Sequence, residues 1–380
     1  IAATKPCAEE RRSCVEATTM SNSALLALLR DATSSQREAI TSSKPFIAVS
    51  AGAGTGKTST LAWRFAWLVA TGEAKCDQIL TVTYTEKAAL EMALRIKATL
   101  RSWKESLKAT GEKGDNLFAL RLEEAERRIE EATISTVHSF SMDLIRSAGP
   151  THGTESHRVP SMPEEEEFWR SVEEALDALD SEWFAARLRD ERREWATLLK
   201  EPDFLDVLEE FGTASMIAFA RSAIGLFSSH GSYPDDLWLD EAALVKKDEA
   251  LASDSAMADD LAALFDEGDR ELDRRFRLAL AKAAALLWAL WETQKESEQW
   301  LSFDDMIRYA KDIIEEDPSL VRRFKAVLVD EFQDINGVQG AFLESLKKLS
   351  GASLFLVGDI KQSIYRFRHA DPSIFARQIA

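Results

Sequence analysis

The residues best suited to chemistry in this chain form a glycine-rich segment that ends in a lysine and a threonine. The segment follows an apolar run at 46–49 and opens a helical pattern at 59–70. Glycines let successive backbone N–H groups turn toward phosphate oxygens, and the N-terminus of the following helix adds positive potential. Lys57 would reach the terminal phosphates, and the Thr58 hydroxyl would bind Mg²⁺. The segment predicts a nucleoside triphosphate site made of Ser50, Ala51, Gly52, Ala53, Gly54, Thr55, Gly56, Lys57 and Thr58.

The alternative for this segment is a glycine-rich turn in an unrelated α/β fold. Ala51 departs from the strict pattern, which has glycine at this first position. The departure leaves Gly56, Lys57 and Thr58 intact, and the strand-like and helical flanks are those that a phosphate loop requires. The sequence therefore favours nucleotide binding.

Two adjacent carboxylates follow a second apolar run, at 326–329. A strand that ends in Asp330 and Glu331 places both at the edge of a sheet. Asp330 would hold Mg²⁺, usually through water, and Glu331 would polarise the attacking water as general base. The two roles need separate groups because a carboxylate committed to a metal is a poor base. An Asp-Glu pair alone is as consistent with a solvated turn, and its combination with the phosphate segment favours catalysis.

A third segment, 357–368, runs from an apolar strand into a loop that mixes an amide, aromatic rings and cations. We expect Gln333 and Asp334 to couple the carboxylates to this segment, in which Gln362 is placed to sense a γ-phosphate. Tyr365, Phe367 and Arg368 suit base stacking combined with phosphate contact. The alternative is that the rings pack in the core and the arginines are solvated.

Short runs rich in β-branched residues alternate with helical stretches on both sides of the middle of the chain. They predict a doubly wound parallel sheet, in which ligands bind beyond the carboxyl ends of the strands. The five predicted strands are 46–49, 79–84, 133–137, 326–329 and 354–357.

The net charge of −18 is unevenly distributed. Residues 151–300 carry −19, whereas 1–150 carry +2 and 301–380 carry −1. The middle block has helical periodicity and few strand signals, which predicts a helical domain inserted into a near-neutral α/β domain. We expect a leader of no function at 1–19, the α/β domain at 20–150 and 301–380, and the insertion at 151–300.

Composition narrows the classes of protein further. Cys7, Cys14 and Cys76 have no spacing typical of a disulfide framework or a metal cluster. The longest apolar helical run, 283–291, is too short to span a bilayer, so no membrane partner is expected. No signal peptide is visible, and the expected compartment is the cytoplasm.

The segments above, taken in order, resemble the N-terminal half of superfamily 1 helicases of the UvrD/Rep/RecB group. Residues 35–40 resemble the Q motif, which assigns Gln36 to the adenine of ATP. Residues 83–92 resemble motif Ia, and 134–140 resemble motif Ib. By this resemblance a single DNA strand would pass Thr83, Tyr84, Thr85, Thr136 and His138. Segments 50–58, 330–334 and 358–368 correspond to motifs I, II and III.

Residues 359–372 and 301–306 are closest to the AddA branch of the group, which consists of helicase/nucleases. The resemblance implies a RecA-like motor domain, a 1B-like helical insertion, ATP with Mg²⁺, and single-stranded and duplex DNA as partners. It also implies a role in recombination or double-strand-break repair, where the expected protein partner is a second helicase-nuclease subunit. The alternatives are a stand-alone UvrD-like repair helicase, a non-motor P-loop ATPase and a DNA-binding module with a decayed ATP site.

Motifs IV to VI of the group do not occur in this sequence. In the family, ATP is hydrolysed between two RecA-like lobes, and arginines beyond motif III neutralise transition-state charge. We therefore expect these residues to be the nucleotide-binding half of a longer motor, close to inactive alone.

Overall fold

A computed structural model of the chain describes residues 23–52, 55–110, 113–148, 158–229, 233–236 and 270–359. Its centre is a five-stranded parallel sheet in the order β1-β5-β4-β2-β3. The strands are β1 (Phe46–Ser50), β2 (Ile79–Thr83), β3 (Thr133–Thr136), β4 (Ala326–Val329) and β5 (Ser353–Gly358). All five predicted strands are confirmed, and each lies within about one residue of its predicted bounds.

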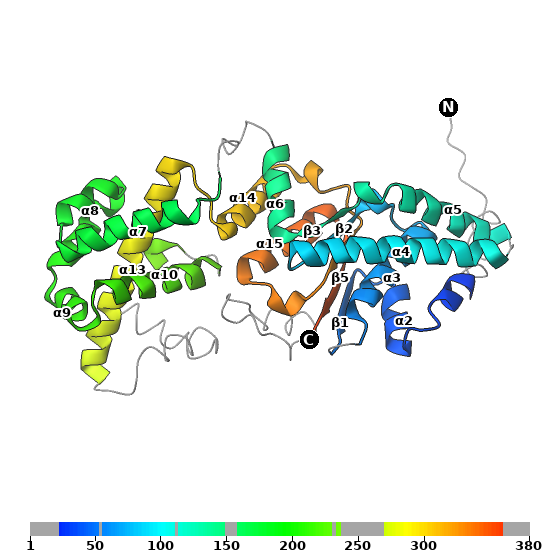
Figure 1. Ribbon diagram of the computed structural model, residues 1–380, viewed down its shortest axis with the longest axis horizontal. Coiled ribbons are helices and arrows are strands. Elements are labelled where there is room, and N and C mark those ends of the chain that lie inside the picture. The colour runs from blue at the N-terminus through cyan, green and yellow to red at the C-terminus, as the bar shows by residue number, and fades with distance from the viewer. Residues whose placement is uncertain are drawn as a thin grey trace, which may run out of the picture.

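Helices cover both faces of the sheet (Figure 1). Alternate strand residues point to opposite faces, so Leu328 and Phe355 join one core while Val329 and Leu356 join the other. The first core includes α2 (Ser34–Thr41), α3 (Lys57–Thr71), α4 (Glu86–Thr110) and α5 (Lys113–Arg127). The second includes α6 (Val137–Ser147), α14 (Phe303–Glu316) and α15 (Gly337–Ser350). This is the α/β layering expected of a RecA-like helicase domain.

A separate group of helices occupies the chain between β3 and β4. We call it the helical block: α7 (Met162–Asp177), α8 (Ser181–Arg187), η4 (Asp190–Lys200), α9 (Pro202–Phe211), α10 (Thr213–Ser229) and α13 (Arg270–Glu298). Its buried residues form a hydrophobic core of their own, in which the rings of Trp169 and Trp291 stack with centroids 5.8 Å apart. Figure 1 shows the block beside the sheet, connected to it through α14. Its described residues are helical apart from connecting turns and one bridge between Arg158 and Trp300.

Local signals explain where these helices begin. A capping box between Ser161 and Glu164 starts α7, whose first turn also carries Glu165. Ser302 caps α14 in the same manner with Asp305. The remaining short elements are 3₁₀ turns: η1 (Cys76–Gln78), η2 (Ile129–Glu131), η5 (Pro234–Asp236), η6 (Pro318–Leu320) and η7 (Phe332–Asp334).

Among the described residues, no single helix has both the length and the apolar character needed to cross a membrane. One sharply bent pair, α9 with α10, passes that test by length and composition only.

Candidate nucleotide site

The phosphate loop connects the end of β1 to the start of α3. Its first residue is held to the neighbouring strand, since the Ala51 N–H donates to the Gly358 carbonyl over 3.0 Å. Gly56 precedes α3 with φ +83°, a left-handed conformation that favours glycine. Lys57 and Thr58 therefore begin the helix, with their backbone at its positive end. Ala53 and Gly54 lie outside the described residues.

Gln36 lies against this loop. Its amide Nε2 donates to the Thr55 carbonyl over 2.9 Å and to the Thr60 hydroxyl over 3.1 Å. Its Oε1 accepts from the Thr33 backbone N–H, which completes the capping box of α2. Gln36 is thus held beside the nucleotide site, and its contact with adenine stays a prediction.

The carboxylates at the end of β4 lie across from the loop. The Lys57 ammonium contacts Glu331 Oε2 over 2.8 Å, although the two residues are 274 positions apart. Glu331 has φ +50°, a left-handed conformation uncommon for a residue other than glycine. Such backbone strain at a strand end is frequent at functional sites. The structure therefore brings the lysine of motif I into contact with a carboxylate of motif II.

The electrostatics of this edge suit a cation. Burial, followed by the charge of Glu331, raises the pKa of Asp330 to about 6. The same two causes, in the same order, raise the pKa of Asp334 to about 6. Asp334 Oδ1 is buried and has no hydrogen-bond partner. A divalent cation would relieve both effects because it favours the ionised carboxylates.

Mg²⁺ fits these residues when phosphate and water complete its shell. The described residues hold no group of three or more His, Cys, Asp or Glu side chains that could bind a metal alone. Mg²⁺ at nucleotide sites is commonly held by one or two protein oxygens together with phosphates and water. Thr58 and Asp330 would supply the protein oxygens.

Gln333 links the carboxylates to the end of β5. Its Nε2 donates to Glu331 Oε2 over 2.8 Å and to Asp334 Oδ2 over 3.2 Å. Its Oε1 accepts from the Asp359 backbone N–H over 2.8 Å. A Cβ on Gly358 would lie 2.6 Å from this oxygen, so the close approach needs glycine there. Gln333 thus contacts both motif II and the start of motif III, as expected, and Asp334 is joined to motif III only through the Gln333 amide.

Three of the predicted DNA-side residues line one cavity of about 550 Å³ together with the carboxylates at the end of β4, whereas Thr85 and Thr136 are not among its lining residues. Its walls come from the ends of β2 and β4, from α6 and from the block helix α10. Among its lining residues are Thr83, Tyr84, His138, Asp330 and Glu331. A larger cavity of about 660 Å³ lies within the helical block, where it is lined by several carboxylates and one arginine. We take the smaller cavity as the side of the site next to the phosphate loop, because Asp330 and Glu331 line it.

Two of the predicted DNA-side threonines are buried and have local structural roles. Thr83 donates to the Thr85 carbonyl, and Thr136 caps α6 while it donates to Glu86 over 2.8 Å. Hydrogen bonds from Ser139 and Thr136 lower the pKa of Glu86, so this carboxylate stays charged. Thr85 is exposed and Tyr84 half-buried. Direct DNA contact stays a prediction for all of these residues.

Phe303 is a further member of the site that the motifs did not single out. It is the first residue of α14, is 59% exposed and lines the same cavity. Its ring meets His138 edge to face with centroids 5.2 Å apart. Burial lowers the pKa of His138, although Asp304 and Glu86 oppose this shift. The sequence feature that could have identified Phe303 is the segment 301–306. Its resemblance to the AddA branch was noted, but no role was assigned to this residue.

Gln362, Tyr365, Phe367 and Arg368 lie outside the described residues, so their predicted roles stay predictions. Their segment begins directly after Asp359 at the end of β5. A Cβ on Gly52 would lie 3.8 Å from Asp359 Oδ2, so this strand end is beside the phosphate loop.

The family described as UvrD/REP helicase N-terminal domain matches residues 32–379 of the chain. The chain belongs to this family. The match extends across the sheet, the phosphate loop, the carboxylates and the helical block.

Several curated proteins are similar over most of the chain. The ATP-dependent helicase/nuclease AddA of Pediococcus pentosaceus is 28% identical over 91% of this chain and 36% of its own length. Its namesake in Lactobacillus delbrueckii subsp. bulgaricus is 29% identical over 90% and 36%. DNA helicase IV of Escherichia coli is 27% identical over 89% and 41%. The chain thus spans less than half the length of these relatives.

Proposed function

We propose that this chain is the ATP-binding half of a DNA helicase that couples ATP hydrolysis to translocation along single-stranded DNA and to duplex unwinding. The observation that carries the proposal is the contact of Lys57 with Glu331, because Glu331 also lines a cavity together with His138 and Tyr84. Lys57 and Thr58 would bind the phosphates and Mg²⁺, Asp330 would hold the metal through water, and Glu331 would take the proton of the attacking water. The similarity to AddA helicase/nucleases supports a role in recombination or double-strand-break repair.

The proposed organisation follows the same family. Residues 20–150 and 301–380 would form motor domain 1A, and residues 151–300 a 1B-like insertion. The separate hydrophobic core of the helical block supports this division. A second motor lobe would supply arginines to the transition state, and a second helicase-nuclease subunit would be the expected partner. Without such arginines hydrolysis would be slower by about 10³–10⁵-fold.

The rate of ATP hydrolysis by the full-length protein that contains this chain, measured with and without single-stranded DNA, tests the proposal. We expect hydrolysis that DNA stimulates strongly and that Mg²⁺ removal abolishes. Hydrolysis that DNA leaves unchanged would favour a non-motor P-loop ATPase. DNA binding without hydrolysis would favour a binding module with a decayed ATP site.

The 380-residue chain alone gives a second test. It should bind Mg-ADP or Mg-ATP by calorimetry, and phosphate release should stay near background with DNA present. Robust DNA-stimulated hydrolysis by this chain would refute the half-motor assignment.

A further inference from the structure

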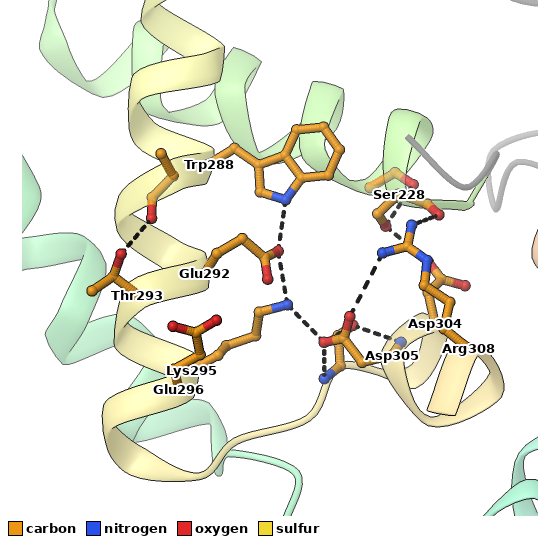
Figure 2. Close-up of polar contacts among 12 residues, drawn as sticks. Ser228, Trp288, Glu292, Thr293, Lys295, Glu296, Asp304, Asp305 and Arg308 are labelled. Carbon is orange, nitrogen blue, oxygen red and sulfur yellow. Dashed lines mark hydrogen bonds and ion pairs between the residues drawn. The ribbon is translucent and has the colours of Figure 1, made fainter. Parts of the chain in front are cut away.

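A polar joint connects the helical block to the layer of helices next to the carboxylates (Figure 2). It lies where α13 ends and α14 begins. Lys295 on α13 is 5% exposed, and its ammonium contacts Glu292 over 2.9 Å and Asp305 over 2.6 Å. Burial acts to lower the pKa of Lys295, but these two carboxylates outweigh it and raise the pKa above its ordinary value. Lys295 is therefore a buried cation that ties α13 to α14.

Asp305 fixes the start of α14. Its Oδ2 accepts from Lys295 and from both the backbone N–H and the hydroxyl of Ser302, the last two over 2.9 and 2.7 Å. Ser302 in turn accepts from the Asp305 N–H over 3.2 Å. The first turn of α14, which carries Phe303, thus has a defined position relative to the helical block.

Asp304, the next residue on this turn, contacts both regions. Its Oδ2 accepts from the Ser228 hydroxyl over 2.9 Å, in the last turn of α10. Its Oδ1 accepts from the Asn336 amide over 3.1 Å. Arg308 donates to the Ser228 carbonyl and reinforces the same contact, as Figure 2 shows. A single carboxylate therefore joins α10 of the helical block to the segment that follows motif II.

Asn336 is held in place by its role as the N-cap of α15. Its Oδ1 accepts from the Gln339 N–H over 2.9 Å, which orients the amide nitrogen toward Asp304. Asn336 is two residues after Asp334, whose carboxylate shares the Gln333 amide with Glu331. The polar contacts and this short buried segment run without a break from α10 to the proposed general base.

We propose that Asp304 and Asn336 are positioning residues that couple the helical block and Phe303 to Glu331, so that a DNA strand held at the shared cavity changes the rate of ATP hydrolysis. The inference rests on the proposed function. The coupling element is the short segment 331–336. At its start Lys57 contacts Glu331 and the Asp359 N–H donates to Gln333, and at its end Asn336 donates to Asp304. A displacement of α10 or of the first turn of α14 moves Asp304, and its hydrogen bond carries Asn336 with it.

An exchange of the two side chains tests this contact in the longest natural protein that contains the chain. Asn336→Asp keeps an N-cap oxygen of equal quality for α15 but replaces the amide donor with a second carboxylate against Asp304. The double variant Asp304→Asn with Asn336→Asp restores a donor and an acceptor in reversed order. The readout is the ratio of DNA-stimulated to basal kcat, measured beside the urea midpoint of unfolding.

We expect Asn336→Asp to lower this ratio about five-fold or more, the lower end of typical coupling between sites. The double variant should return to within about two-fold of the wild type. Asp312→Asn makes the Asp-to-Asn change of the double variant at an exposed position of α14; it is the control for that change and should keep the full ratio.

An unchanged ratio in Asn336→Asp, or a loss that the double variant fails to restore, would overturn the inference even if the urea midpoint shifts. Where Asn336→Asp fails to fold, Ser228→Ala removes the hydroxyl contact to Asp304 and leaves the cap of α15 intact, with the same expected fall in ratio. A wild-type protein that DNA does not stimulate would refute the proposed function itself, and the inference with it.

Discussion

Two lysine–carboxylate contacts, one at the sheet edge and one at the joint with the helical block, look alike in distance and differ in surroundings. Lys57 meets Glu331 over 2.8 Å, and the Glu331 side chain keeps 37% of its surface exposed. Lys295 meets Asp305 over 2.6 Å, and the Asp305 side chain is only 13% exposed and accepts two further hydrogen bonds from Ser302. The partners of the exposed contact can separate and bind ligand phosphates and water instead. The partners of the buried contact have neither the space nor free hydrogen-bonding groups to do so. The first is therefore suited to chemistry and the second to structure.

The same contrast extends to the regions around the two contacts. The sheet edge gathers charged residues from distant parts of the chain because the carboxyl ends of parallel strands meet there. The helical block encloses aromatic and aliphatic side chains, and most of its carboxylates face outward. Substitutions at the open contact should therefore change rates, and substitutions at the closed contact should change stability.

The largest expected change in rate is at the open contact. Glu331→Gln should slow ATP turnover by the full-length protein by about 10²-fold or more, because the proposed general base is lost while the phosphate contacts remain. Nucleotide affinity and the urea midpoint should change little. Lys57→Ala should instead weaken nucleotide binding, as measured by calorimetry. Wild-type kcat in Glu331→Gln would show that this carboxylate is not the base.

The closed contact predicts the opposite pattern. Lys295→Met keeps the length of the side chain but removes the buried ammonium from Asp305 and Glu292, so that the cation left near Asp305 is Arg308, at the longer distance of 3.8 Å. We expect the free energy of unfolding to fall by about 3–5 kcal/mol, the usual cost of removing one partner of a buried ion pair. Urea denaturation measures it, with Lys311→Met on α14, a more exposed lysine paired with Glu315, as the control. Equal stability of the two variants would show that the buried Lys295 pair contributes no more to stability than the more exposed Lys311 pair.

Phe303 lies between the sheet edge and the helical block, and its substitution tests whether both regions contact the same DNA strand. Phe303→Ala should weaken binding of single-stranded DNA by roughly 1–3 kcal/mol, the usual worth of a base stacked on an aromatic ring. Fluorescence anisotropy at fixed salt measures this, and Tyr365→Ala and Phe367→Ala should act to a similar extent. Exposed Leu94 on α4 provides the control, because Leu94→Ala removes apolar surface outside the cavity. An unchanged DNA affinity in Phe303→Ala would show that single-stranded DNA does not stack on Phe303 in this cavity.

The strands and the site residues at their ends could be predicted because their signals are local. Each strand is a short apolar run, and residues such as Lys57 and Asp330 follow directly in the sequence. The sequence predicted that Gln333 would reach the next segment but not that it would contact the Asp359 backbone, and spacing could not predict that Asp304 contacts both Ser228 and Asn336. Those contacts depend on strand order and on how α10 packs against α14, and neither leaves a periodic signal. The helical block was predicted from composition and periodicity, which specify helices but not their partners.

The smallest expected effect concerns the charge of Asp330. It tests whether a carboxylate at the sheet edge destabilises the fold, in contrast to Asp305 at the joint. Its folded-state pKa of about 6 exceeds the ordinary value of 3.8, so the folded protein binds more protons than the unfolded one between these pH values. Stability therefore falls as pH rises from about 4 to 6, and Asp334 acts in the same direction. Asp330→Asn removes this penalty, and the free energy of unfolding at about pH 7.5 should rise by about 1–2 kcal/mol, with no gain at about pH 4.

Urea denaturation of Asp330→Asn at the two pH values measures the effect, and the exposed Asp143→Asn on α6 serves as the control. Mg²⁺ with nucleotide should stabilise the wild type more than Asp330→Asn, because the variant has lost the carboxylate that favours the cation. A loss of stability in Asp330→Asn at the higher pH would show that this carboxylate stabilises the fold, as Asp305 does, and the distinction between the sheet edge and the joint would fail at Asp330.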